Sequence, residues 1–527
     1  MQIRKNLFKK AGLAVRLVIG AAGLSLLALS TTSDNPDAAK ATAGYAFGSE
    51  NSWIRVQNVG NADADVDLNY FNESGQLAGT DSCPSDKCDA LYPGSGWTFF
   101  QKDSAGLPGG FQGSAVISTD QPVVAILAKD VFRGNTFSIA GDTLTMGQGS
   151  HRVYLPVTGK RDGPNMDWSG RFVVQNMSDT VQACVQITYL SIQSDSEVAW
   201  EPYKLPATGK PANAMAGCPN GGMPLPARGS IFKYPDNMAV SDKFTGSVRI
   251  DLLTNSANQG ADKQFIQVTA DSWNSNLASF GSYRGFDESE LGNEIILPLV
   301  DNRVGEANSY STRFTIVNKD PNQPATVTLR YDGYDLDNGA AFVSKTNTFT
   351  IKGSRLCFQD SSDNDCLGAG DDLPFNWVGT ARLTSNQPLA VVVDRGTYLN
   401  DGFTNYRGVR PQDAATKVLL PVLNKNYGSI RGANGWNSWF RVMVADGGSA
   451  NVTVTYYGLD LPGGQQSYTV KVDREFTAFQ HLEWMLPDGF AGTAIITSDR
   501  PIVALADIYT DVFSGDPDLV YNGTPLR

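Results

Sequence analysis

The sequence predicts an all-β protein with four tandem immunoglobulin-like antiparallel β-sandwich domains after an N-terminal signal peptide. One stretch is written four times along the chain, starting at Phe111, Phe244, Trp377 and Phe490. Short alternating strands and turn residues recur around each copy, and no sustained helical period of apolar residues appears after residue 30. The 53 glycines and 26 prolines among 527 residues also suit short strands and turns.

The repeated stretch is clearest as FAGTAIITSDRPIVALADIY, from Phe490 to Tyr509, and it predicts a β-hairpin. Its first half alternates with a period of two, SDRP supplies turn residues, and Pro501 begins a second, more apolar run. A short helix also fits that run, but its β-branched residues and its proline favour a strand. A glycine follows the opening aromatic residue by two positions in every copy, so we expect positive φ or tight backbone packing there. These glycines are Gly113, Gly246, Gly379 and Gly492.

Four further signatures recur around the repeated stretch. The first is a Leu-Pro strand, where proline suggests a sheet edge or a kink; it is found at Val153, Ile295 and Val418 but not in the first unit. The second is a strand such as WIRVQN, at Trp53, Phe172, Phe314 and Phe440. The third ends in tyrosine, at Tyr70, Tyr189, Tyr331 and Tyr456, with an alternation that predicts one buried and one wet face. The fourth is YRG or YNG, at Tyr283, Tyr406 and Tyr521.

These signatures divide the chain into a signal peptide and four units. Each unit holds about six to eight short strands, as is typical of immunoglobulin-like sandwiches, whereas β-propeller blades would be shorter and more regular. The second unit carries a Pro- and Gly-rich insertion from about Glu201 to Asp236. The predicted boundaries are 1–30 for the signal peptide, then 31–150, 151–292, 293–415 and 416–527 for the units.

Residues 1–30 predict export, to a secreted, extracellular or cell-surface location. A basic head precedes an apolar core from Leu17 to Leu29, which is too short for a membrane span, and small residues allow cleavage after Ser30. An uncleaved anchor is the alternative. Removal of this segment takes away five basic and no acidic residues, so the net charge changes from −12 to −17. Such an acidic surface repels phosphate backbones, and we expect no nucleic-acid partner.

The six cysteines fall into close pairs, one pair in each of three units. In an exported protein they predict three disulfides within units. A zinc site is disfavoured, because the chain's histidines are only His151 and His481. The predicted pairs are Cys83 with Cys88, Cys184 with Cys218, and Cys357 with Cys366.

Motifs for catalysis and metal binding are weak. Two histidines and the absence of a GxSxG elbow disfavour a catalytic triad, while paired carboxylates for glycoside hydrolysis stay open. LPVTG at Leu155 and LPATG at Leu205 match a sortase pattern but lack the apolar span and basic tail of a sorting signal. The loop 332–339 fails the EF-hand spacing. A second candidate calcium cluster is Asp360, Asp363, Asp365, Asp371 and Asp372. We expect no cofactor and no resident metal.

Tryptophans offer a sequence signal for a glycan ligand. Exposed indole rings could bind glycans by stacking, but large aromatics more often fill cores and domain junctions. The candidates are Trp97, Trp436, Trp439 and Trp484.

Taken together, the signatures resemble secreted bacterial proteins with tandem immunoglobulin-like repeats, over about Gly44 to Arg527. Such modules commonly serve adhesion, surface-layer or fibre assembly, and the resemblance implies no catalytic residues. We therefore expect a non-enzymatic secreted or cell-surface structural or adhesive protein, a rod of four sandwiches. The alternative is a glycan-binding extracellular protein that uses exposed aromatics.

The two ends of the chain suggest head-to-tail self-association into filaments. Residues after about Tyr521 form a tail, and the first unit lacks its Leu-Pro strand and so offers a sheet edge. A contact between the tail of one molecule and the first unit of the next would not close. The alternative is a frayed tail on a monomer.

Overall fold

The computed structural model describes residues 49–134, 136–144, 149–201, 218, 222–253, 265–305, 310–358, 366–367, 372–397, 402–428 and 435–527. The predicted signal peptide, LPATG at Leu205 and most of the second candidate calcium cluster lie outside these residues. In the described part of the chain, regular structure is β-strand apart from short 3-10 turns. The prediction of an all-β protein is confirmed.

The strands fall into four consecutive groups, here named units 1 to 4. Unit 1 holds β1 (Ser49–Asn58), β2 (Val66–Asn72), β3 (Leu77–Cys83), β4 (Gly96–Phe100), β5 (Gly113–Thr119), β6 (Val123–Arg133) and β7 (Thr136–Leu144), with η1 (Gln101–Asp103). Unit 2 holds β8 (Arg152–Lys160), β9 (Trp168–Asn176), β10 (Ala183–Ser191), β11 (Ser196–Glu201), β12 (Met223–Leu225), β13 (Ser230–Lys233), β14 (Phe244–Leu252), β15 (Ile266–Asn274), β16 (Phe280–Arg284) and β17 (Phe286–Asp287), with η2 (Pro235–Asn237) and η4 (Glu288–Glu290).

The other two units repeat the pattern. Unit 3 holds β18 (Gly292–Asn302), β19 (Tyr310–Asn318), β20 (Ala325–Asp335), β21 (Ala341–Ile351), β22 (Ser354–Phe358), β23 (Trp377–Thr397) and β24 (Phe403–Arg407), with η6 (Pro411–Asp413). Unit 4 holds β25 (Ala415–Lys425), β26 (Asn437–Val444), β27 (Ser449–Tyr457), β28 (Gln465–Asp473), β29 (Glu475–Phe479), β30 (Phe490–Tyr509), β31 (Ser514–Asp516), β32 (Asp518–Asn522) and β33 (Thr524–Pro525), with η7 (Pro462–Gly464) and η8 (Gln480–Leu482).

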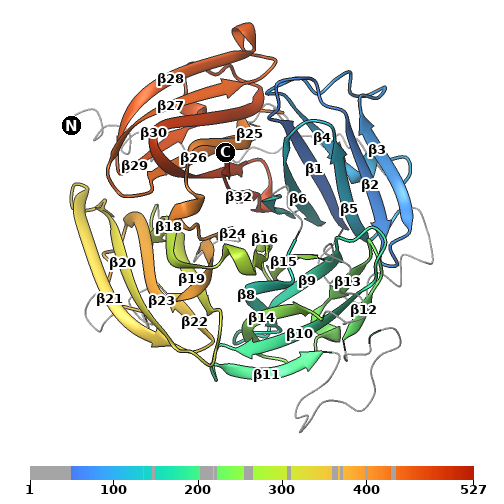
Figure 1. Ribbon diagram of the computed structural model, residues 1–527. Coiled ribbons are helices and arrows are strands. Elements are labelled where there is room, and N and C mark those ends of the chain that lie inside the picture. The colour runs from blue at the N-terminus through green and yellow to red at the C-terminus, as the bar shows by residue number, and fades with distance from the viewer. Residues whose placement is uncertain are drawn as a thin grey trace.

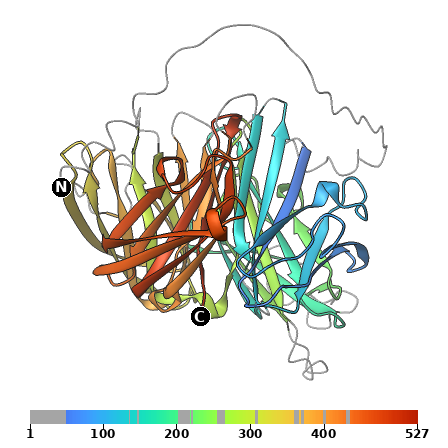
Figure 2. The same ribbon diagram turned by 90° about the horizontal axis from the view of Figure 1, so that it is seen from above.

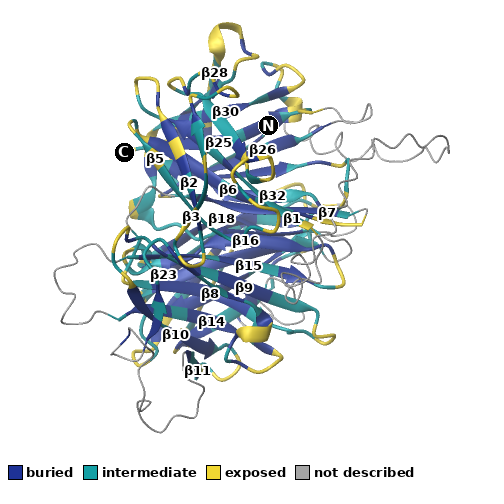
Figure 3. Cartoon of the chain, turned by 90° about the vertical axis from the view of Figure 1, so that its right-hand side faces the viewer, coloured by how far each residue is buried: buried dark blue, intermediate teal, exposed yellow. Residues whose placement is uncertain are grey.

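Each unit has an outer and an inner antiparallel set of strands. In unit 4 the outer set runs β28-β27-β30-β25, and the inner set runs β29-β26-β30-β32. Unit 3 has the same order, and unit 2 has it with β14 and β15 as two separate strands. Unit 1 has only β3-β2-β5 in its outer set, because it lacks the Leu-Pro strand. Peripheral strands such as β21 and β28 alternate between buried or partly buried and exposed residues, and buried residues fill the middle of the molecule (Figure 3).

The predicted hairpin is wrong in all four copies. In unit 4 the whole stretch is one strand, β30, whose first half pairs with β25 and β27 and whose second half pairs with β26 and β32. In unit 1 the two halves are β5 and β6, which likewise pair with different strands and not with each other. The physical reason is that the second half is apolar on both faces, and only an inner strand is buried on both faces.

The glycine of the repeated stretch packs tightly, as expected, and without positive φ. A Cβ at Gly492 would meet the carbonyl oxygen of Tyr457 on the neighbouring strand and the ring of Phe490 two residues before. The aromatic side chain therefore folds over the glycine, which explains why the two recur together. The same environment surrounds Gly113, Gly246 and Gly379.

The Leu-Pro and YxG signatures are two halves of one contact. The Tyr521 hydroxyl donates a hydrogen bond to the carbonyl of Val422, which follows the Leu-Pro proline, at 2.5 Å. Gly523 leaves room for the Leu-Pro strand, since a Cβ there would meet Val418 and Leu420. Tyr283 and Tyr406 make the equivalent bonds to Val157 and Leu299. Unit 1 lacks both signatures together, as this contact requires.

The four units form a closed ring, so the predicted rod is wrong. In Figure 1 they surround a common axis, and Figure 2 shows the ring from the side. Four equivalent inner strands lie against one another at the axis, namely β7, β16, β24 and β32. Unit 4 reaches unit 1 of the same chain through β31, which pairs in parallel with β7. The same arginine contact, to the carbonyl of a Leu-Pro proline, joins Arg441 to Pro298 at 2.9 Å and, at the closing interface, Arg55 to Pro421 at 3.0 Å.

The head-to-tail prediction assumed a free C-terminal tail, and the structure does not contain one in the described residues. Tyr521 is fully buried, β32 pairs with β30, and β33 pairs with β25. The C-terminal residues are therefore part of unit 4 and not a free tail. The strand that unit 4 offers to unit 1 is β31, and it binds within one chain, where the effective concentration is highest.

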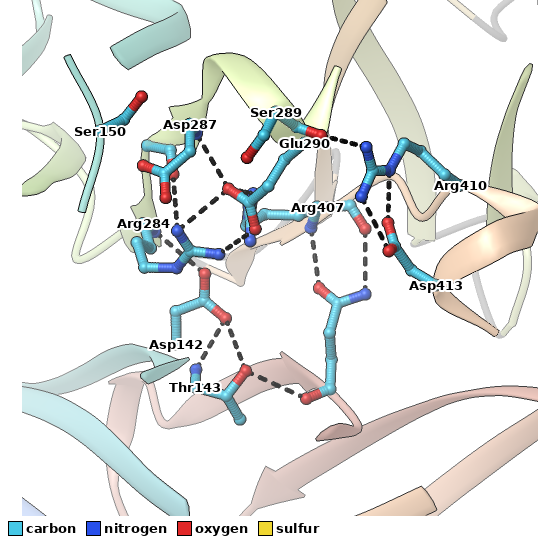
Figure 4. A network of polar contacts seen from close by, with 12 residues as sticks. Asp142, Thr143, Ser150, Arg284, Asp287, Ser289, Glu290, Arg407, Arg410 and Asp413 are labelled. Carbon is cyan, nitrogen blue, oxygen red and sulfur yellow. Dashed lines mark hydrogen bonds and ion pairs between the residues drawn. The ribbon is translucent and has the colours of Figure 1, made fainter. Parts of the chain in front are cut away.

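A polar network closes one end of the axis (Figure 4). The Glu290 carboxylate accepts hydrogen bonds from Arg284 of unit 2 at 2.5 Å and from Arg407 of unit 3 at 2.8 Å. Burial opposes ionisation, but Arg407 and Arg284 hold the pKa of Glu290 well below its usual range. Asn522 of unit 4 exchanges two hydrogen bonds with the backbone of Arg407, each of 2.9 Å. The charges in this network pair with one another, so it holds units together.

One aspartate at the axis contacts the three other units, two through its carboxylate and one through its backbone. Asp516 of unit 4 is fully buried, and its oxygens accept the backbone N–H of Phe280 in unit 2 at 2.8 Å and of Phe403 in unit 3 at 2.9 Å. Its own backbone belongs to β31, beside β7 of unit 1. Asp516 thereby joins unit 4 to the other three units.

The three predicted cysteine pairs lie at disulfide distance within units 1, 2 and 3. Their Cα atoms are 5.3, 5.6 and 5.3 Å apart for Cys83–Cys88, Cys184–Cys218 and Cys357–Cys366. Each bond links segments of one unit, and unit 4 has none. No helix in the described part of the chain has the length and apolarity needed to cross a membrane.

Gly492→Val is expected to lower the free energy of unfolding by about 2 kcal/mol or more, because the added side chain must displace a strand backbone and an aromatic ring. Urea unfolding of the mature protein, followed by fluorescence, measures the change. Gly109→Val is the control, since a Cβ there meets no atom within 4 Å. Equal stability of the two variants would contradict the packing argument.

Asp516→Ala is expected to destabilise the ring by about 3 kcal/mol, because two buried backbone N–H groups lose their acceptor. Thermal unfolding and limited proteolysis of the whole chain measure the effect. Asp488→Ala removes the same charge from an exposed side chain of unit 4 and should change little. A wild-type unfolding temperature for Asp516→Ala would show that this carboxylate does not hold the units together.

Candidate functional site

A cleft of about 800 Å³ lies between units 3 and 4. Strands β18, β19 and β23 form its unit 3 wall, and β26, β29, β30 and the segment that follows β30 form its unit 4 wall. Its aromatic lining consists of Tyr310, Trp439, Phe479, Tyr509 and Phe513. Its charged lining consists of Asp301, Arg395, Arg441, Asp507, Asp511 and Asp518.

The alternation of β30 explains how its side chains reach the cleft. Ala506 and Ile508 face the core of unit 4, so Asp507 and Tyr509 face unit 3. One step earlier on the same face, Leu505 packs into the core of unit 3. The inner sheet of unit 4 is thus buried on both faces, except where the cleft opens beside Asp507 and Tyr509.

Arg395 is the central cation of the cleft. Its Nε donates to Asp301 Oδ2 at 2.5 Å, while one of its terminal nitrogens lies 3.7 Å from Asp507 Oδ2. Its guanidinium lies over the ring of Tyr310, 3.9 Å from the centroid, and 5.6 Å from that of Trp439. Asp301 therefore holds Arg395 more closely than Asp507 does.

Asp507 and Asp518 form an acidic pair on the unit 4 wall. Asp507 is only 2% exposed, and its Oδ1 has no hydrogen-bond partner among the described residues. Burial and the neighbouring Asp518 raise the pKa of Asp507 well above its usual value, against the effects of Arg395 and the Trp439 indole. Burial also raises the pKa of Asp518, which accepts a hydrogen bond from the Tyr310 hydroxyl at 3.2 Å.

The equivalent aspartates of units 2 and 3 are fully engaged. Both carboxylate oxygens of Asp271 accept hydrogen bonds from the Lys129 ammonium group of unit 1, at 2.7 and 2.9 Å. Asp271 also accepts a hydrogen bond from Arg171. Burial raises its pKa, but Arg171 and Lys129 outweigh this and lower the pKa to about 2. Asp394 binds Arg313 at 2.9 Å and Asn405 at 2.5 Å. Asp507 is therefore the exception among the three.

The residues that the sequence singled out are scattered. Trp97 packs partly buried against the core of unit 1, and Trp436 contacts Phe137 of unit 1 with ring centroids 5.8 Å apart. Trp439 lines the cleft, whereas Trp484 is 86% exposed and lies outside the cleft lining. Of these four tryptophans, Trp439 is the one that lies with polar groups in the described cleft.

The two histidines are not brought together. His151 stacks on Phe265 in unit 2. His481 Nδ1 lies 3.1 Å from the Tyr509 hydroxyl at the edge of the cleft, and burial, then Lys425, lowers its pKa. At neutral pH this imidazole is therefore uncharged.

The structure describes the first candidate calcium loop and one residue of the second. The loop 332–339 spans the end of β20 and the turn to β21, where Asp335 accepts the backbone N–H of Asp337 and Asn338. Of the second acid cluster only Asp372 is described. Within the described ranges no group of three or more His, Cys, Asp or Glu side chains is placed to hold a metal ion.

Sequence reasoning did not find Asp301, Tyr310, Arg395, Asp507 or Asp518. One signal was present, because ALADIY places a charged residue inside a strand that is otherwise apolar. A charge in such a position is costly unless it is paired or functional. Asp518 lies on β32, which pairs with β30 in the same unit, whereas Asp301, Tyr310 and Arg395 belong to unit 3, and only the ring brings them to Asp507.

Comparisons with known proteins add little. No family model matches the chain, and no curated protein matches it. Among solved structures, the chain is similar to one described as "Crystal Structure of Thermotoga maritima 1070", at 13% identity, over 22% of this chain and 97% of that chain. The TM-score is 0.17, so this similarity says nothing about the fold or function of the whole chain.

Asp507→Asn is expected to stabilise the protein at neutral and alkaline pH. The folded state raises the pKa of this carboxyl, so it binds the proton more tightly than the unfolded chain does, and its contribution to stability falls as pH rises. The gain should vanish at acid pH, near the ordinary aspartate value. Thermal unfolding across the pH range measures it.

Asp271→Asn is the matched control, because it removes the equivalent carboxylate. Its pKa is lowered, so its stabilisation is present above the unfolded value and the variant should be less stable than wild type at neutral pH. The same sign of change in both variants would contradict the difference drawn between the two aspartates.

Proposed function

We propose that this is a secreted, non-enzymatic adhesive protein that binds an extracellular glycan in the cleft between units 3 and 4. The observation that carries the proposal is the lining of the cleft, where Trp439, Tyr310 and Tyr509 lie beside Asp301, Asp507 and Asp518. Sugars present apolar C–H faces, which pack on aromatic rings, and hydroxyl groups, which donate to carboxylates. A cleft of this size suits a few sugar residues.

The extracellular location is supported from two sides. The N-terminal sequence has the features of a signal peptide, and three cysteine pairs at disulfide distance suit an oxidising compartment. We infer that the units are immunoglobulin-like sandwiches and that the chain is related to secreted bacterial proteins with such repeats. Both inferences rest on the sequence signatures and on the two-sheet form of the units.

Adhesion through a cleft replaces fibre assembly as the preferred structural role. The ring places β31 and the C-terminal strands inside the molecule, so strand exchange between molecules has no free partner at these positions. Light scattering of the mature protein tests self-association, and a monomer at high concentration is the expected result.

A glycan array probed with the mature protein, followed by calorimetry on the best ligand, tests the proposed function. Trp439→Ala is expected to weaken binding by about tenfold or more, because it removes a stacking surface. Trp439 also packs against the core of unit 3, so Tyr509→Ala serves as a second variant. Trp484→Ala is the control. Binding that survives both cleft variants, or that Trp484→Ala abolishes, would contradict this site.

A further inference from the structure

We propose that the glycan bound in the cleft is an amino sugar polymer, and that Asp507 Oδ1 receives its primary ammonium group, with Asp518 beside it. This inference rests on the proposed function and names the chemical class of the ligand. It is carried by the charge balance of the cleft, by the vacant acceptor on Asp507, and by a contact elsewhere in the ring.

The cleft holds more carboxyl groups than guanidinium groups, and a positive charge on a ligand favours the ionised form of Asp507 and Asp518, whose pKa burial raises. Asp301, Asp507 and Asp518 face a single guanidinium, that of Arg395. Arg441 also lines the cleft, but its guanidinium forms an ion pair with Glu475 at 2.5 Å. Its Nε donates a hydrogen bond to the carbonyl of Pro298. A ligand that brings a positive charge therefore complements this cleft better than a neutral one.

Asp507 has an acceptor position to spare. It is almost completely buried, and its Oδ1 has no hydrogen-bond partner among the described residues. Ionisation of a buried carboxyl group in this state is unfavourable, and a cationic donor that enters the cleft relieves that cost. Asp507 lines the cleft while Oδ1 itself is buried, so a ligand group reaches this oxygen by displacing neighbouring side chains.

The interface between units 1 and 2 contains the proposed contact within the protein itself. There the ammonium group of Lys129 donates to both oxygens of Asp271, the counterpart of Asp507, at 2.7 and 2.9 Å. Lys129 lies on β6 of unit 1, and the equivalent residue on β23 of unit 3 is Arg395, as the registers of these strands with β7 and β24 show. Asp301 draws Arg395 away, so its distance to Asp507 is 3.7 Å. We expect an ammonium group of the ligand to take the place that Lys129 takes on Asp271.

Three β-1,4-linked oligosaccharides of equal length test this assignment, because they differ only at C2 of each sugar. Glucosamine carries an ammonium group there, N-acetylglucosamine an acetamide, and glucose a hydroxyl. Calorimetry with the mature protein, at a pH where the amine is protonated, should show the glucosamine oligomer binding about tenfold more tightly than the other two.

Asp507→Asn should remove this preference, so that the glucosamine oligomer binds no more tightly than the two neutral oligomers. Asp488→Asn is the matched control, since it removes one charge from an exposed side chain of the same unit, and it should keep the preference. Equal losses in the two variants would mean non-specific attraction to an acidic protein and would overturn the inference. A tetralysine peptide that binds as tightly as the glucosamine oligomer would overturn the assignment to a sugar.

The outcomes separate this inference from the proposed function. If the neutral oligomers bind in the cleft as tightly as the glucosamine oligomer, glycan binding stands and the ammonium contact is wrong. If neither these oligomers nor any glycan on the array binds, both are wrong.

Discussion

The ring depends on inner sheets that are buried on both faces. One face of each inner sheet packs in its own unit, and the other reaches the unit before it in the ring. Leu505 and Val520 of unit 4 lie in the core of unit 3, Val392 of unit 3 lies in the core of unit 2, and Ile126 and Phe137 of unit 1 lie in the core of unit 4. The units therefore share cores, and the burial of apolar surface that drives each unit to fold also joins that unit to the next.

A charged side chain on a strand that is buried on both faces costs free energy of desolvation at every position. The aspartates of the inner strands must therefore find partners, either within their own unit or across an interface, and most do so. Asp271 finds Lys129, Asp394 finds Arg313, and Asp516 takes two backbone N–H groups. Asp507 lacks a close ion-pair partner because Arg395 donates its hydrogen bond to Asp301 instead. The carboxylate of Asp507 therefore stays incompletely paired at the interface between units 3 and 4.

Local patterns in the sequence predicted the all-β class, the repeat, the cysteine pairs and the close packing at Gly492. Each of these depends on residues that are near in sequence or on an alternation within one strand. The hairpin prediction failed because SDRP is compatible with both a reversal and a bend, and only the identity of the pairing strands decides between them. The ring and the cleft could not be predicted, since contacts such as Arg55 with Pro421 join distant segments.

The cleft illustrates how a repeated fold acquires a specific site. Units 2, 3 and 4 carry an aspartate at the same position of an inner strand, and a change in partner choice between units 3 and 4 is enough to leave one of the three incompletely paired. The cost is local, because Asp516 and the shared cores hold the ring from other directions. A binding group can therefore stay imperfectly satisfied in the unbound protein, and the energy that the fold forgoes at Asp507 becomes available to a ligand that completes it.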